Sequence, residues 1–174
     1  VVYDFDSRKV WEKAASVTVP AERCVEAFKV EFPPLDRPHF IRLSVREAGR
    51  EIASTFYWRS PEKYEPKTPD ALTGPCTAGF ESLSALPRTT LSVQTSDAAG
   101  TLRVTVTNTG DKIAFLTRLA LTGEDGKPLR PSFYSDNWFS LLPGESKTVT
   151  VSHPAKPFKL SVSAWNAEAS AENR

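Results

Sequence analysis

The sequence predicts an all-β protein built from two sandwich domains, the first of them incomplete. Short runs alternate apolar and polar residues, turn-forming residues separate these runs, and no stretch supports a long helix. The clearest run is residues 133–151, which predicts strand, tight turn and strand. Pro143-Gly144 suits the centre of a type II turn. Trp138 and Leu142 share one phase, and Phe139 and Leu141 share the opposite one.

The first domain is expected over residues 1–60 and is predicted to be a partial sandwich of five strands. The predicted strands are residues 1–5, 9–19, 23–32, 40–46 and 51–59. A closed immunoglobulin-like sandwich has about seven strands. Five strands would leave unpaired edges and an uncovered apolar face. We therefore expect a segment that precedes Val1 to complete this domain.

A linker and a second domain follow. Residues 61–87 contain five prolines, which predict a stiff, extended connection. Within it, Phe80, Leu83 and Leu86 lie three apart and predict one helical turn. Residues 88–174 alternate over seven short strands with turn signals such as Asn108-Thr109-Gly110-Asp111 and Ala98-Ala99-Gly100 between them. This pattern predicts a complete immunoglobulin-like β-sandwich.

The composition excludes several classes of function. The chain has 22 Lys and Arg against 21 Asp and Glu and no basic patch, so we expect no nucleic-acid partner. No apolar run approaches the roughly 20 residues of a membrane span. The chain begins inside a predicted strand and contains no Met, so we expect it to be a piece of a longer protein.

No catalytic or metal-binding constellation is visible. Hydrolysis of a glycosidic bond with retention needs two carboxyl groups about 5 Å apart, but the acids here fall mostly at predicted turns. His39 and His153 stand alone beside prolines, without the ligands that a tetrahedral metal site needs. We expect no catalytic residue, no metal and no cofactor in this chain. Turn acids are Asp6, Glu47, Asp111, Glu124 and Asp125.

Four segments carry a family resemblance. In order along the chain they are STFYWRS (54–60), FESLSALP (80–87), FYSDNWFSLLPGESKTV (133–149) and VSAWN (162–166). They resemble the C-terminal β-sandwich domains of glycoside hydrolase family 2, on the branch of the β-mannosidases and exo-β-D-glucosaminidases. Each motif is moderately specific, and their shared order strengthens the match.

The resemblance implies non-catalytic accessory domains of an exo-acting glycosidase that hydrolyses terminal β-glycosidic bonds. In that family the catalytic glutamates belong to a (β/α)₈ barrel, for which this chain has no strand–helix pattern. The implied partners are upstream domains of the same enzyme, namely the barrel and the missing strands, together with the carbohydrate substrate. Bacterial members are often exported, so a periplasmic or extracellular location is expected.

Two aromatic positions are candidates for contact with the substrate pocket or with another domain. Asp136-Asn137-Trp138 predicts an Asx-type turn followed by a core tryptophan; the alternative is a loop that leans on the barrel. Trp165 follows the polar phase of the last strand. It either caps the core at a bend or packs against another domain.

The cysteines and the overall function leave alternatives open. Cys24 and Cys76 permit one disulfide without requiring it, and the phase that Cys24 shares with Phe28 favours a buried thiol. A stand-alone carbohydrate-binding module is a second hypothesis, but no row of exposed aromatics supports it. An extracellular protein-interaction sandwich is a third.

Overall fold

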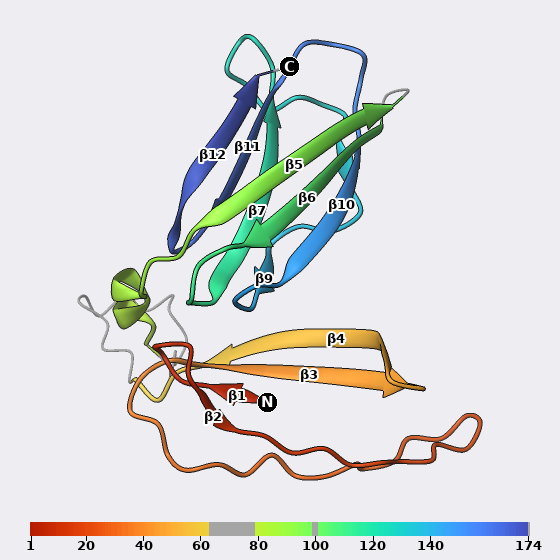
Figure 1. Cartoon of the computed structure of the whole chain (residues 1–174), viewed down its shortest axis with the longest axis vertical. Coiled ribbons are helices and arrows are strands. Elements are labelled where there is room, and N and C mark those ends of the chain that lie inside the picture. The colour runs from red at the N-terminus through yellow and green to blue at the C-terminus, as the bar shows by residue number, and fades with distance from the viewer. Residues whose placement is uncertain (63–78, 99–100, 174) are drawn as a thin grey trace, which may run out of the picture. The chain divides into compact units, whose positions relative to one another are not determined.

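The computed structural model describes residues 1–62, 79–98 and 101–173. The chain forms two units, residues 1–86 and residues 87–174, and both consist of antiparallel β-strands (Figure 1). The all-β prediction is therefore confirmed. Most of the predicted linker, Cys76 and the Ala99-Gly100 part of a predicted turn lie outside the described residues.

The first unit contains one four-stranded sheet in the order β2-β1-β3-β4. The β3–β4 hairpin turns through Ala48 and Gly49, with φ of 47° and 80°. Two successive positive φ angles are typical of a type I′ turn, whose twist matches that of the strands it joins. The strands are β1 Val2–Tyr3, β2 Lys9–Trp11, β3 His39–Glu47 and β4 Arg50–Arg59.

Of the five strands predicted for this unit, one is absent and one is shorter than predicted. Residues 23–32 form no strand, and the strand predicted for residues 9–19 ends at Trp11. The predicted turn between these two segments is present, because Arg23 N donates to Pro20 O at 3.3 Å. A strand needs a neighbour for its backbone groups, and within the described residues these segments have none. The alternation of apolar and polar residues did not reveal that these two segments lack a neighbouring strand.

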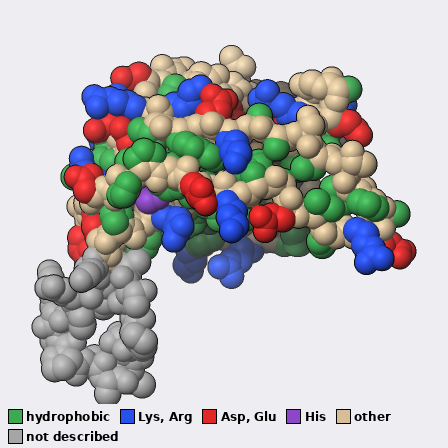
Figure 2. Space-filling model, turned by 90° about the horizontal axis from the view of Figure 1, so that it is seen from below, with side chains coloured by type: hydrophobic (Ala, Val, Ile, Leu, Met, Phe, Trp, Pro, Cys, Tyr) green, Lys and Arg blue, Asp and Glu red, His purple; other side chains and the backbone are tan. Residues whose placement is uncertain are grey.

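The sheet of the first unit leaves apolar side chains in contact with solvent. Val45 is 57% exposed and Tyr57 is 52% exposed, whereas a closed sandwich would bury one face of each strand. Figure 2 shows apolar side chains interspersed with charged ones on one face of the molecule. The described part of this unit is thus half of a sandwich. Other exposed apolar residues are Val10, Val17, Val19, Val25, Val30, Leu43, Ile52 and Trp58.

His39 makes the stability of the first unit dependent on pH. It begins β3, is 7% exposed and packs edge-on against Phe32. Burial lowers the pKa of its imidazole below the usual 6.5, so the unfolded chain takes up a proton first as the pH falls. We expect the unit to lose stability as the pH falls below about 6.5. Urea midpoints at pH 7.5 and 5.5 should differ more for the unaltered chain than for His39→Phe; equal differences would contradict the prediction.

The helical turn predicted from Phe80, Leu83 and Leu86 is confirmed. It is a 3-10 helix, η1 Glu81–Ala85, that buries Leu83 (6% exposed) and is followed by buried Leu86. Ser82 Oγ donates to Glu62. These contacts attach the end of the first unit to its body.

The second unit is a complete sandwich of two four-stranded sheets, β5-β6-β10-β8 and β12-β11-β7-β9. Its described residues form eight strands where seven were predicted, because the strand after Asn166 was missed. Its strands are β5 Leu91–Ala98, β6 Thr101–Asn108, β7 Ala114–Thr122, β8 Phe133–Tyr134, β9 Phe139–Leu141, β10 Ser146–Ser152, β11 Lys159–Ala164 and β12 Ala167–Asn173.

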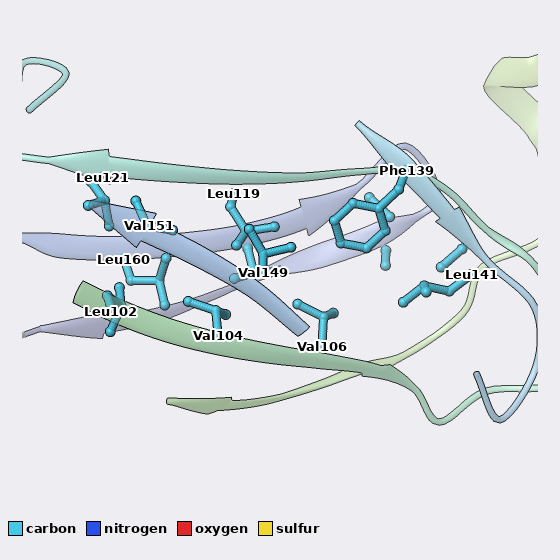
Figure 3. Close-up of a cluster of buried hydrophobic side chains, with 14 of the residues drawn as sticks. Leu102, Val104, Val106, Leu119, Leu121, Phe139, Leu141, Val149, Val151 and Leu160 are labelled. Carbon is cyan, nitrogen blue, oxygen red and sulfur yellow. The ribbon is translucent and has the colours of Figure 1, made fainter. Parts of the chain in front are cut away.

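The core of the second unit lies between its two sheets (Figure 3). Phe139 and Leu141 share one phase, as predicted, and both point inward. The Pro143-Gly144 turn is also confirmed: Glu145 N donates to Leu142 O at 3.0 Å and Gly144 has φ of 75°. This turn carries the chain from β9 in one sheet to β10 in the other. Fully buried members of the core are Leu102, Val104, Val106, Leu119, Leu121, Val149, Val151, Leu160 and Val162.

Candidate functional site

The candidate site lies along one edge of β7. One side of this strand pairs with β11 from Arg118 to Thr122. The other side pairs with β9 only at Ala114 and Thr117, on either side of a register shift. Beyond Thr117 no strand covers that edge within the described residues, and a bare strand edge leaves backbone N–H and C=O groups without partners.

Residues 129–137 supply the missing partners of β7. Leu129 N donates to Leu121 O at 2.9 Å, and Leu121 N donates to the Tyr134 hydroxyl at 3.0 Å. Leu119 N donates to Asn137 Oδ1 at 2.9 Å, and Asn137 Nδ2 donates to Leu119 O at 3.0 Å. The Asn137 amide therefore makes the same pair of bonds that a neighbouring strand would make.

This segment also joins the two sheets of the sandwich. Tyr134 belongs to β8, which pairs with β10 in one sheet, and its hydroxyl accepts from β7 in the other. Ser135 N donates to Thr150 O at 2.9 Å. We call residues 134–137 the clasp, because they close one side of the sandwich.

The polar candidates Asp136 and Asn137 are engaged in this clasp. Asp136 Oδ1 accepts from Asn137 N at 2.7 Å, and its carboxylate forms an ion pair with Lys147. Asn137 Oδ1 also accepts from Trp138 N at 3.1 Å. As predicted, both side chains bond nearby backbone, but each accepts from the next residue and not from the residue two positions on, as an Asx turn requires. Both side chains hold the loop, and the residue that the loop displays is the next one, Trp138.

Trp138 is not the core residue that the sequence favoured. Its side chain is 57% exposed, and the Arg118 guanidinium lies over its ring at 5.3 Å from the centroid, within the range of a cation–π contact. Trp138 has φ of 62°, which is uncommon for a bulky residue. Phe139, which has the opposite phase, is the buried neighbour, and Trp138 therefore faces outward.

A groove with a volume of about 670 Å³ lies beside the clasp. Buried Leu119 and Leu121 belong to its lining, and two exposed aromatics, Phe133 (69%) and Trp138, do as well. Two arginines and no carboxylate line it. The lining residues are Arg118, Leu119, Ala120, Leu121, Thr122, Pro128, Leu129, Arg130, Pro131, Ser132, Phe133, Tyr134, Asn137 and Trp138.

Trp165, the other aromatic candidate, does not line this groove. It lies at the turn between β11 and β12, where its N donates to Phe115 O at 2.7 Å. The last predicted strand does bend there, but Trp165 is 55% exposed and does not cap the core. The prediction of a core cap was wrong, because the bend is a turn into β12 and its outer side is open.

The buried thiol predicted at Cys24 was also wrong. Cys24 is exposed and free, because the segment around it forms no strand and packs against no second sheet in the part of the chain that the structure describes. Its predicted pairing with Cys76 stays a prediction, since Cys76 lies outside the described residues.

Asp111 and His153 show how titratable side chains are placed in the described part of the second unit. Asp111 is 84% exposed, and a hydrogen bond from Lys112 lowers the pKa of its carboxyl; a general acid needs a raised pKa. His153 packs edge-on against Phe158, with Nε2 3.5 Å from Asp97. Across the described ranges, no three His, Cys, Asp or Glu side chains gather as metal ligands. None of the helical residues described forms a segment long and apolar enough to cross a membrane.

Two buried asparagines that the sequence did not single out lie close to each other in the chain's tertiary structure, since they bond the adjacent residues Lys112 and Ile113. Asn108 is fully buried, and its amide donates to Lys112 O and Leu141 O. Asn166 is 2% exposed and donates to Pro87 O and Ile113 O. Asn108 was read only as a turn residue. The signal that could have identified them is an asparagine at the inward phase of a strand end.

Comparison with known proteins gives both units a family match. Residues 73–167 match the exo-β-D-glucosaminidase Ig-fold domain, and residues 1–64 match the mannosidase Ig/CBM-like domain. An exo-β-D-glucosaminidase of Streptomyces avermitilis is 35% identical over 136 residues, which cover 68% of this chain and 15% of that protein. An exo-β-D-glucosaminidase of Amycolatopsis orientalis is 29% identical over 175 residues, covering 88% and 16%.

Solved structures show the same fold. The crystal structure of the exo-chitosanase CsxA of Amycolatopsis orientalis has a TM-score of 0.69 at 21% identity, covering 99% of this chain and 23% of that one. A complex of its D469A variant with PNP-β-D-glucosamine gives a TM-score of 0.71 at 20% identity. The chain thus spans less than a quarter of the proteins it matches, and the two immunoglobulin-like domains are confirmed.

Proposed function

Because the chain belongs to the family of exo-β-D-glucosaminidase Ig-fold domains, we propose that it forms the non-catalytic accessory domains of an exo-acting glycosidase. In this role the two units pack against and support a catalytic domain that lies elsewhere in the same enzyme. The observation that carries the proposal is the family match over residues 73–167, together with the small share of its relatives' length that this chain covers.

The open sheet of the first unit supports the presence of preceding strands. Its exposed apolar residues, such as Val45 and Tyr57, would be buried by a second sheet. The extended segments at Val17 and Val25 offer backbone groups that such strands would pair. We propose that strands from upstream in the same enzyme complete this sandwich.

The substrate of the whole enzyme is proposed to be a chain that ends in β-linked glucosamine. The support is that both named relatives are exo-β-D-glucosaminidases. The first unit matches a mannosidase domain, so a terminal β-mannoside is the substrate to be tested beside it. A periplasmic or extracellular location fits a polymeric substrate.

The test is an assay of the full-length protein beside the isolated 174-residue chain. Full-length protein should release glucosamine from chitosan oligosaccharides and leave aryl β-mannosides intact, and the isolated chain should do neither. Release of mannose would overturn the proposed substrate. Retention of the isolated chain on chitosan or mannan beads would favour a stand-alone carbohydrate-binding module and overturn the accessory role.

A further inference from the structure

We propose that the groove beside the clasp is a docking site for a carboxylate-bearing surface segment of the enzyme's own catalytic portion, with Trp138, Arg118 and Arg130 as its anchors. The inference rests on the proposed function and specifies the chemistry of the partner. Its starting point is that hydrogen bonds of the clasp hold Trp138 in an exposed position.

The clasp fixes Trp138 in an outward position. Asn137 accepts from Trp138 N and is itself bonded twice to Leu119. These bonds hold a positive φ in a bulky residue, which persists only where its surroundings determine it. An indole that is 57% exposed presents a large apolar face to water. Burying the indole against a partner would recover the free energy lost by exposing this apolar face to water.

The composition of the groove is that of a protein interface. Trp, Tyr, Phe and Arg are enriched at the energetically dominant centre of interfaces, whereas Lys and acidic residues are depleted. This groove has one Trp, one Tyr, one Phe and two Arg, and its lining contains no Lys, Asp or Glu. Pro128, Leu129 and Pro131 add further apolar atoms to the lining.

The charge of the groove selects the partner. Among the ion pairs of the described residues, none involves Arg118 or Arg130, and Asp136 of the clasp is paired with Lys147. Two arginines favour a carboxylate through charge-assisted, bidentate hydrogen bonds. They would repel the protonated amine of a glucosamine unit. The groove therefore fits an acidic protein segment and disfavours the cationic sugar chain.

The length of the relatives indicates where such an acidic segment can come from. This chain corresponds to 15% and 16% of the two exo-β-D-glucosaminidases it matches. An enzyme of that length has ample surface outside these two units, and a tethered partner binds at a high effective concentration. The catalytic portion is the occupant to which the proposal commits.

The decisive experiment compares hydrogen exchange in the full-length protein and in the isolated chain. Backbone amides of residues 118–122 and 134–139 should exchange more slowly in the full-length protein. Arg118→Glu and Trp138→Ala should abolish this difference and speed thermal inactivation of the full-length protein roughly tenfold or more. Both variants should leave the isolated chain as stable as before. The matched control is Arg103→Glu, which reverses an exposed arginine on β6 in the opposite sheet.

The other occupants give different results. Equal exchange in both proteins would overturn the proposal. So would a raised KM for chitosan oligosaccharides in Arg118→Glu with unchanged exchange, which would indicate a glycan subsite. A dimer of the isolated chain that dissociates in Trp138→Ala would assign the groove to a second copy. If unaltered full-length protein cleaves neither glycoside, the proposed function fails, while the exchange measurement still tests the docking.

Discussion

Replacing Asn108 by alanine should destabilise the second unit by roughly 3–4 kcal/mol, one of the two largest effects expected here. The side chain is fully buried. Its Oδ1 accepts from Thr89 Oγ1 at 2.8 Å and from Gly110 N at 3.2 Å. Its Nδ2 donates to Lys112 O at 2.7 Å and to Leu141 O at 3.0 Å. Alanine would remove all four bonds. Thr89 Oγ1 would keep Lys112 O as a partner at 3.1 Å, whereas the other groups would lose the bond that the Asn108 side chain supplies.

The effect can be measured by urea unfolding of the chain, with hydrogen exchange of the β6 and β10 amides as the probe of the second unit. Asn108→Asp should be at least as damaging, because it keeps the acceptor, loses the donor and buries a charge. Thr105→Ala is the control, since its hydroxyl bonds the Thr148 hydroxyl at the surface; we expect a change within about 0.5 kcal/mol. An Asn108→Ala variant as stable as Thr105→Ala would contradict the assignment.

A second variant reaches the same network from outside. A Cβ added at Gly110 would overlap the Thr89 hydroxyl and lie 3.0 Å from Thr90 N. The Thr89 hydroxyl also donates to Asn108 and lies beside Lys112 O. Gly110→Ala should therefore displace the hydroxyl that Asn108 binds and cost about 1–3 kcal/mol. An unchanged urea midpoint would show that this loop is not part of the network.

The sequence predicted what depends on local pattern. Alternation gave Phe139 and Leu141 a shared phase, which is the buried one, and Pro143-Gly144 predicted the turn that is present. Alternation did not show which of the two phases faces the core. These features depend on side-chain phase and on backbone preferences that a few residues carry. The all-β fold and the second sandwich followed from them. The order of strands within the sheets did not, because it depends on contacts between distant residues.

The wrong predictions share one physical cause, which is that a pattern does not state what will cover it. Cys24 and the segment around it have a buried-strand pattern but no partner strand in the described structure. Trp138 was expected in the core, and Trp165 was expected either to cap the core or to pack against another domain, yet both are exposed. In each case the local sequence does not show whether another segment covers the apolar residue.

The candidate site was found only in part for a related reason. The Asp136-Asn137-Trp138 motif was recognised as a turn. The sequence did not show which residues this segment bonds, because Leu119 and Leu121 lie more than ten residues earlier in the chain. The role of Tyr134 was missed because a hydroxyl that reaches the other sheet leaves no periodic trace. The clasp is thus a tertiary feature built from local motifs.

The second of the two largest effects is expected at Leu160, which should be compared with Leu43. Leu160 is 1% exposed and pairs with Leu121 across the β11–β7 ladder. Truncating a buried leucine costs the transfer free energy of the lost methyl groups and leaves a cavity. Leu160→Ala should therefore destabilise the second unit by about 2–5 kcal/mol in both the isolated chain and the full-length protein.

Leu43→Ala is the same chemical change at a position that is 37% exposed in the first unit. In the isolated chain it should cost about 0.5 kcal/mol or less, since solvent already reaches this side chain. In the full-length protein, upstream strands would bury it, and the same variant should then cost about 2 kcal/mol or more. Hydrogen exchange resolved by unit separates the two positions. If Leu43→Ala costs equally little in both proteins, no upstream strand covers this part of the sheet, and the open face of the first unit must have another cause.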